Sequence, residues 1–200
     1  MPGITPSQTI GPFAAPSLTP NEKGRTQYDW KQLVGSNTVT PDTSGERIRI
    51  EGQLLDGAGK PLDGVLLETW QADAQGRYAH PRDGRATNSS FKGFGRVETD
   101  GQGRFAFDTI KPGQAPGPNG SAQAPHIVVA IHLRGILSHL YTRIYFGDES
   151  SANAGDPILK LVPAERRDTL IAKRGAGGSG PVYKIDFQIQ GDHETVFFDI

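Results

Sequence analysis

Residues 124–134 read APHIVVAIHLR, and this stretch decides how the rest of the chain is interpreted. From Ile127 to Leu133 the residues are apolar and largely β-branched, which predicts a buried β-strand. Side chains two positions apart in a strand point to the same face, so a metal site built on this strand would need histidines at positions 126 and 128. Val128 stands at the second of these positions. The stretch therefore predicts a buried strand that begins with a single candidate ligand, His126.

The segments on either side of this strand also favour β-structure. Alternation of polar and apolar residues, or a short apolar run, predicts a β-strand. On this basis, further strands are expected at 47–54, 65–71, 94–99, 104–110, 141–146 and 183–189. The turn sequence at 100–103, DGQG, predicts that its two flanking strands form a hairpin. One helix is expected near residues 163–173, with a proline early and a lysine late. Together these elements predict an all-β fold, a two-sheet β-sandwich.

The composition divides the chain into two parts. Its 26 glycines and 15 prolines are spread along 200 residues, which is typical of many short strands joined by turns. Residues 1–46 are rich in Pro, Thr, Ser and Asn and show no sustained periodicity beyond a helical turn at 28–33. They are predicted to form an N-terminal arm. The arm carries large apolar residues such as Ile10, Phe13 and Trp30, so we do not expect a purely solvated linker. Residues 47–200 are expected to form the sandwich domain.

Charge and cysteine content exclude several classes of function. The chain has no cysteine, so it has neither disulfides nor thiolate metal sites. With 21 basic and 22 acidic residues, it shows no electrostatic footprint for nucleic acid or for an anionic membrane. There is no basic segment followed by an apolar run, and no run of eighteen apolar residues. We therefore expect a cytoplasmic protein whose partner is a small molecule or another protein.

Five segments, taken in order, resemble the intradiol ring-cleaving dioxygenases. They are LETWQADAQGRY at 67–78, FGRVETDG at 94–101, IKPG at 110–113, PHI at 125–127 and RIYF at 143–146. The resemblance extends from about Thr5 to Ile200, and it implies the β-sandwich of that family. It also implies an iron(III) ion held by two tyrosines and two histidines, a ligand set that suits a hard ferric ion because phenolate stabilises the oxidised state.

The resemblance places the four iron ligands at definite positions of this sequence. The two tyrosines are expected at about Arg85 and at Ala115, and the two histidines at His126 and Val128. Only His126 matches, so the resemblance implies a vestigial metal position that does not retain iron. We interpret His126 as a hydrogen-bonded structural histidine. A relocated metal site formed by His126, His132 and Tyr141 is the less favoured alternative.

The resemblance implies a non-catalytic alpha subunit that pairs with a homologous, iron-bearing beta subunit in a large hetero-oligomer. It also implies that the arm at 1–46 packs on that partner subunit. In such enzymes the alpha chain completes the partner's pocket for a carboxylated catechol such as protocatechuate, which reacts with O2. The matching positions here are Thr9, Gly11, Pro12 and Arg134. Glycine lets a backbone approach a flat ring closely, proline is rigid, and arginine offers a planar fork of donors to a carboxylate. An ion pair between subunits is the alternative role for Arg134.

Two other classes of function stay open at this level. The chain could be an autonomous β-sandwich binding module with no enzyme partner, or an autonomous enzyme with relocated ligands. Metal analysis of the isolated chain tests the second. A neighbouring reading frame that encodes a homologue with both tyrosines and a complete His-x-His would argue against the first.

Overall fold

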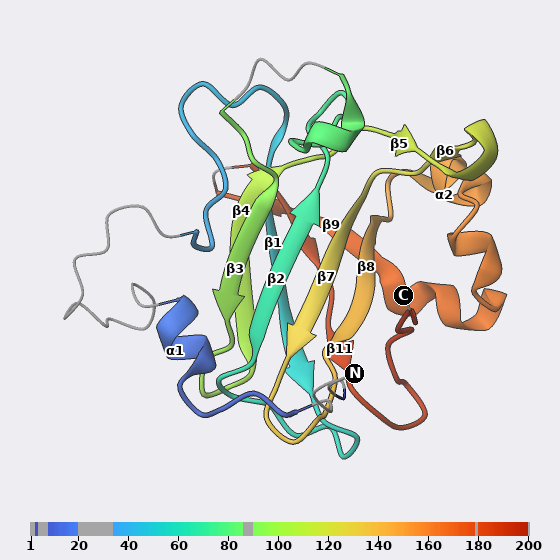
Figure 1. Ribbon diagram of the computed structural model, residues 1–200. Helices are drawn as coiled ribbons and strands as arrows, with labels where there is room; N and C mark the ends of the chain where they lie inside the picture. The colour runs from blue at the N-terminus through green and yellow to red at the C-terminus, as the bar shows by residue number, and fades with distance from the viewer. Residues whose placement is uncertain (1–2, 4–7, 20–33, 86–89, 179, 200) are drawn as a thin grey trace.

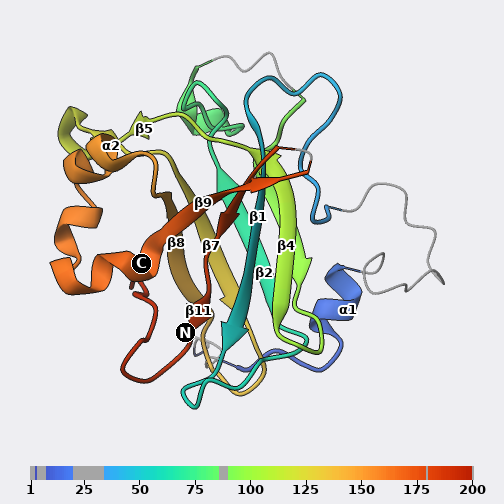
Figure 2. The same cartoon turned by 180° about the vertical axis from the view of Figure 1, so that it is seen from behind.

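Two β-sheets pack face to face in the computed structural model, which describes residues 3, 8–19, 34–85, 90–178 and 180–199 (Figures 1 and 2). One sheet, here called the front sheet, has the order β3 (Phe94–Glu98), β2 (Leu66–Gln71), β7 (His126–His132) and β8 (Leu140–Phe146). The rear sheet has the order β4 (Arg104–Ile110), β1 (Arg47–Leu55), β10 (Gly180–Lys184) and β9 (Ile171–Gly177), with β11 (Phe187–Gln188) beside the end of β1.

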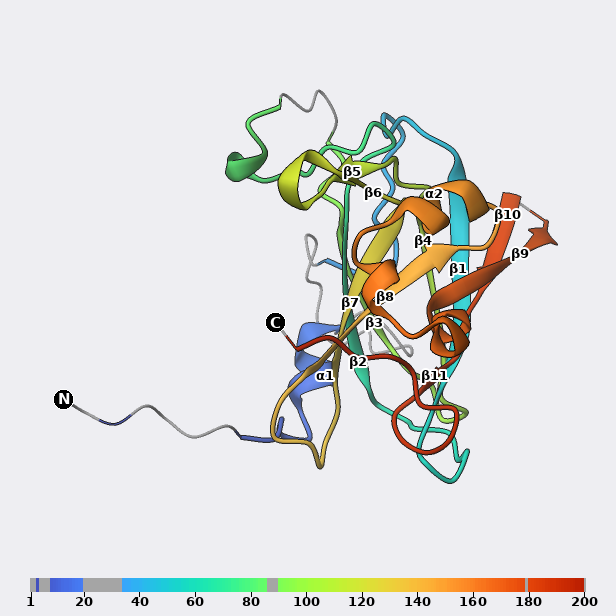
Figure 3. The same ribbon diagram turned by 90° about the vertical axis from the view of Figure 1, so that its right-hand side faces the viewer.

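The two sheets meet along one edge. A short parallel pairing between β8 and β9 joins Tyr145 to Ile171 and Phe146 to Ala172, so the hydrogen-bonded network continues from one layer into the other. Figure 3 shows the two layers from the side. Most strand pairs are antiparallel, whereas β1 runs parallel to β10 and β11. The mixed two-layer arrangement confirms the predicted all-β fold class.

The hydrophobic core fills the space between the sheets, and β7 shows why. Ile127, Val129 and Ile131 are fully buried and face the core, together with side chains such as Ile50 and Leu67 from the opposite and neighbouring strands. The residues between them on β7 face the outer side of the front sheet, because side chains alternate along a strand. This alternation explains why an apolar run at 126–132 forms the strand on which the front sheet is centred.

The predicted hairpin at 94–110 is wrong. The turn itself forms as expected: Gly103 donates its backbone N–H to the Asp100 carbonyl at 2.8 Å and has a φ of +68°. However, β3 pairs with β2 in the front sheet, whereas β4 pairs with β1 in the rear sheet. Leu54 donates its backbone N–H to the Gly103 carbonyl at 2.8 Å, which fixes the turn against β1. A tight turn reverses the chain direction, but in a sandwich the reversed strand can enter the other layer.

The helical segments are short. The helix expected at 163–173 is a 3-10 helix at Ala164–Leu170, and the next residues belong to β9. The sequence did not predict two short α-helices, α1 (Ala14–Leu18) and α2 (Ser150–Gly155). The remaining elements are the 3-10 turns Pro81–Asp83, Pro118–Gly120 and Leu159–Leu161 and the short strands β5 (Ala115–Pro116) and β6 (Ala122–Gln123). Within the described residues, no helix is long and apolar enough to cross a membrane.

The strand predicted at 183–189 is divided into β10 and β11 at residues 185–186. Asp186 at this break accepts a hydrogen bond from the Gln53 backbone N–H at 2.8 Å, so the side chain replaces a regular strand contact. The helical turn predicted at 28–33 lies outside the described residues. The division into arm and sandwich domain stays a prediction.

The described parts of the N-terminal segment lie against the sandwich at several places. Thr19 at the end of α1 donates its hydroxyl to the Glu98 carboxylate at 3.0 Å, and it is buried. Farther along the chain, the Thr38 hydroxyl donates a hydrogen bond to the Thr109 hydroxyl at 2.9 Å. These contacts fix where the exposed residues before α1 leave the sandwich, at the end of the front sheet to which β7 points (Figure 1). Packing of the segment on a partner subunit stays a prediction.

Candidate functional site

A cavity of about 570 Å³ lies on the outer side of the front sheet, at the end where β7 begins. We call it the His126 pocket. Six of the side chains that line it carry the argument below: Trp70, Tyr78, Arg85, His126, Val128 and Arg143. The strand register determines which residues form its floor. Val128 pairs with Trp70 of β2 on one side and with Arg143 of β8 on the other. Cross-strand partners on one face of a sheet lie side by side, so these three residues form a continuous row.

The His126 pocket contains the positions where the family resemblance places iron ligands. Arg85, His126 and Val128 line it, and Ala115 is buried directly before Pro116, which also lines it. These positions are spread over more than forty residues of sequence, yet the fold brings them to one cavity. That this cavity is a vestigial metal position stays a prediction.

His126 is held as a neutral histidine. Its Nδ1 atom donates to the Ala124 carbonyl at 2.8 Å, so its Nε2 atom carries the lone pair, and the Tyr78 hydroxyl lies 3.5 Å from it. Burial, followed by the Arg143 guanidinium, lowers the pKa of His126 to about 4. The hydrogen bonding agrees with the interpretation of His126 as a structural histidine.

The residues present do not fit iron(III). Arg85 is cationic, and its Nε atom lies 2.6 Å from Asp83 Oδ1. Val128 and Ala115 offer no electron pair. Burial raises the pKa of Tyr78, so its side chain is a neutral phenol and not a phenolate at neutral pH. No cluster of three or more His, Cys, Asp or Glu side chains that could hold a metal occurs in the part of the chain that the structure describes.

The relocated metal site is not formed either. His126 and His132 stand at the two ends of β7, which are about 20 Å apart because each residue of a strand advances about 3.3 Å. The Nε2 atom of His132 instead lies 3.4 Å from Glu68 Oε2, and the His132 ring centroid is 5.3 Å from that of His139. His139 packs edge-on against Tyr141. Sequence spacing missed His139 because the turn after β7 brings it back over the strand.

The four residues expected to reach a partner's pocket lie near this second end of β7. Thr9 accepts a hydrogen bond from the Gly135 backbone N–H at 2.9 Å, which places the segment containing Gly11 and Pro12 next to the residue after Arg134. Thr9, Gly11, Pro12 and Arg134 are all exposed. A Cβ atom added to Gly11 would meet no described atom within 4 Å, so the contacts inside this chain do not require glycine there.

Two important residues were missed by sequence reasoning. Arg143 on β8 lies in the row described above, and the alternation of 142–144 was the signal that could have placed it on the outer face. Asp156 follows α2, is fully buried, and accepts a hydrogen bond from the Ala124 backbone N–H at 2.7 Å. No sequence pattern marks Asp156, because its donors come from separate segments.

Lowering the pH from 7 to 5 is expected to reduce the free energy of unfolding through His126 by about 2 kcal/mol. The unfolded histidine takes up a proton near pH 6.5, whereas the folded one resists protonation until about pH 4. The folded state thus binds fewer protons between these values, and stability falls as the pH falls through them. Urea unfolding at pH 7 and pH 5 measures the change. His126→Gln should lose less stability over this range than the unaltered protein, and equal losses would contradict the assignment.

Comparison with known proteins was made against families, characterised relatives and solved structures. A family model described as Dioxygenase matches residues 19–191. The protocatechuate 3,4-dioxygenase alpha chain of Burkholderia cepacia is 47% identical over 199 residues, covering 98% of this chain and 97% of the relative. The protocatechuate 3,4-dioxygenase beta chain of the same species is 39% identical over 160 residues, covering 76% of this chain and 67% of the relative.

The solved structures give the same assignment. The dioxygenase domain of a dioxygenase and carbohydrate-binding protein fusion from Streptomyces sp. SirexAA-E has a TM-score of 0.58 and 26% identity, and the match covers 94% of this chain and 98% of that chain. The fold and the full-length similarity agree with each other. The chain therefore belongs to the intradiol dioxygenase family, in the group that contains the alpha chains of protocatechuate 3,4-dioxygenase.

Proposed function

We propose that this chain is the metal-free alpha subunit of an iron(III)-dependent intradiol dioxygenase that cleaves protocatechuate (3,4-dihydroxybenzoate) with O2 to 3-carboxy-cis,cis-muconate. Its partner is a homologous beta subunit that holds the iron, and the two form a large hetero-oligomer in the cytoplasm. The observation that carries the proposal is the His126 pocket, where a guanidinium and an isopropyl group stand at two ligand positions, while alanine occupies a third position beside the pocket. The similarity to both an alpha and a beta chain supports the pairing.

In this proposal the chain acts on the substrate at the other end of β7. Arg134 presents its fork of N–H donors to the substrate carboxylate, and a guanidinium keeps its charge at any working pH. Gly11 lets the backbone approach the aromatic ring, and Pro12 offers a rigid apolar edge. The bond from Gly135 to the Thr9 hydroxyl suggests a positioning role for Thr9, because it ties the segment before α1 to the loop that carries Arg134.

In the assembled enzyme, Arg134→Ala is expected to raise the KM for protocatechuate by about tenfold or more, since a charge-assisted hydrogen bond to the carboxylate is lost. Catechol lacks the carboxylate, so its KM should change by less than about threefold. Steady-state kinetics on both substrates measures the difference. Arg134→Lys is the matched control, because it retains the charge but not the planar fork. Its KM for protocatechuate should lie between those of the unaltered enzyme and of Arg134→Ala.

Equal effects of Arg134→Ala on protocatechuate and catechol would contradict carboxylate recognition. If Arg134 instead forms an ion pair between subunits, the variant should weaken assembly, which size-exclusion chromatography of the mixed subunits detects. An autonomous binding module is not favoured, because the chain matches an enzyme subunit over its whole length.

A further inference from the structure

The His126 pocket carries an excess of positive charge. Three arginines line it, and the one carboxylate that lines it, Asp83, is engaged by Arg85 through bonds of 2.6 and 2.8 Å. Arg82 and Arg143 have no carboxylate within 4 Å among the residues that the structure describes. The lining therefore has two positive charges, on Arg82 and Arg143, that no described carboxylate compensates. Arg143 is half-buried and Arg82 is exposed, and cations that face a cavity favour an anionic ligand.

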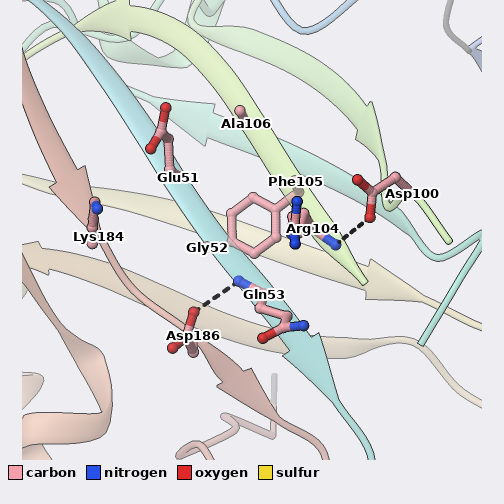
Figure 4. Close-up of a pocket in the computed structure, with 9 residues that line it drawn as sticks. All are labelled: Glu51, Gly52, Gln53, Asp100, Arg104, Phe105, Ala106, Lys184 and Asp186. Atoms are coloured by element: carbon pink, nitrogen blue, oxygen red, sulfur yellow. Dashed lines mark hydrogen bonds between the residues drawn. The ribbon is translucent and has the colours of Figure 1, made fainter. Parts of the chain in front are cut away.

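A second cavity of similar size lacks this excess of positive charge. It measures about 530 Å³ and lies on the rear sheet, between β1, β4 and the chain around Lys184 (Figure 4). Its charged lining consists of three carboxylates and two cations: Glu51, Asp100, Asp186, Arg104 and Lys184. An anion is therefore not favoured there.

The guanidinium of Arg143 is held in a fixed orientation by its contacts. Its Nη1 atom donates to Gln123 Oε1 at 2.8 Å and lies 3.3 Å from the Tyr145 hydroxyl, and its guanidinium carbon is 5.8 Å from the centre of the Phe198 ring. The described residues accept no hydrogen bond from its Nε or Nη2 atoms. One edge of the guanidinium is thus held by the protein, while donors remain for a ligand, and a planar fork suits the two oxygens of a carboxylate.

The opposite side of the pocket is aromatic. Trp70 and Tyr78 stack with ring centroids 6.0 Å apart and an interplanar angle of 13°, and both are half-buried. Val128 adds an apolar floor between Trp70 and Arg143. Ligand cavities usually combine an apolar and aromatic lining with a few fixed polar groups, at volumes of about 300–1,000 Å³. The neutral His126 ring and the Tyr78 hydroxyl offer further hydrogen bonds.

We propose that the His126 pocket is a non-catalytic binding site for a monocyclic aromatic carboxylate. The carboxylate pairs with Arg143, and the ring lies over Val128 against the Trp70 and Tyr78 wall. The proposed role is binding alone, because the described residues that line the pocket form no cluster of metal ligands. This inference does not depend on the proposed function, since it concerns the opposite end of β7 from Arg134 and is tested on this chain without a partner.

The test is a titration of the full chain with benzoate, followed by Trp70 fluorescence and by calorimetry. We expect saturable binding with one site per chain and a Kd on the order of 1 mM or tighter, which is typical for a ligand of about nine non-hydrogen atoms. Arg143→Gln should weaken binding by about tenfold or more, and Arg143→Lys should weaken it less. Arg104→Gln, a change at an exposed arginine of the second cavity, should leave it unaltered.

Ligand controls keep the test decisive if Arg143→Gln fails to fold. Benzyl alcohol has the same ring without a charge, and inorganic phosphate has charge without a ring, so each should bind at least about tenfold more weakly than benzoate. The proposal is overturned by unchanged benzoate binding in a folded Arg143→Gln variant, by equal binding of phosphate or benzyl alcohol, or by no binding of benzoate. Failure here would leave the expected KM effect of Arg134→Ala untouched, so the two proposals are distinguished.

Discussion

Replacing Asp156 with asparagine is expected to lower the free energy of unfolding by about 4 kcal/mol, because it disrupts a buried carboxylate that four donors surround. The residue is fully buried. Its Oδ1 atom accepts bonds from the Ile158 and Leu159 backbone N–H groups at 2.9 and 2.7 Å and from the Tyr145 hydroxyl at 3.1 Å. Its Oδ2 atom accepts the Ala124 N–H at 2.7 Å. An asparagine must turn an NH2 group toward donors that already fill this space.

Asp156 also joins two parts of the fold that the sequence separates. Ala124 lies two residues before His126, and Ile158 and Leu159 belong to the helical region after α2. Chemical denaturation of the full chain measures the loss of stability. Asp192→Asn is the matched control, because Asp192 is exposed and its replacement should change the free energy of unfolding by less than about 0.5 kcal/mol. A loss below about 1 kcal/mol for Asp156→Asn would contradict the structural role.

The strands were predictable from sequence because local patterns determine them. On β7 the buried positions Ile127, Val129 and Ile131 alternate with residues of the outer face, and a period of two is visible without any tertiary information. The assignment of strands to layers was not predictable. The DGQG turn at 100–103 favoured a hairpin, yet β3 and β4 pair in different sheets, since turn chemistry sets direction and not the layer that receives the strand.

The candidate site also has features that the sequence predicts and features that depend on the tertiary structure. The resemblance located His126 and the replaced positions at Arg85, Ala115 and Val128. The fold brings Arg85, His126 and Val128 to one pocket, with Ala115 next to Pro116 of its lining. Arg143 was not singled out, because its importance comes from the strand register that sets it beside Val128 and from the absence of a nearby carboxylate among the described residues. The contact of Thr9 with Gly135 joins residues 126 positions apart, and no local pattern indicates it.

β7 therefore connects two sites with different chemistry. At its start, the His126 pocket combines one neutral histidine with two uncompensated arginines, which disfavours a metal and favours an anion. Beyond its end, Arg134 and the segment that bears Gly11 are exposed, as the proposed contact with a partner requires. We propose that the chain has lost the iron ligands at the start of β7, and that it contributes to catalysis only through the residues beyond the other end of this strand.

Iron content and ring cleavage, measured for the chain alone and after mixing with a beta subunit, test the central claim most directly. A lone imidazole among arginines does not retain iron(III), so we expect the isolated full chain, after incubation with iron and desalting, to carry less than about one iron per ten chains. It should show no tyrosinate-to-iron(III) colour. Its rate of protocatechuate cleavage should lie at least about a thousandfold below that of the assembled enzyme.

The matched sample is a homologous beta chain that has both tyrosines and the complete His-x-His, loaded with iron in the same way. Adding the present chain to it should yield an assembly that cleaves protocatechuate, with all of the iron bound by the beta chain. Stoichiometric iron, tyrosinate colour and ring cleavage in the present chain alone would contradict the account.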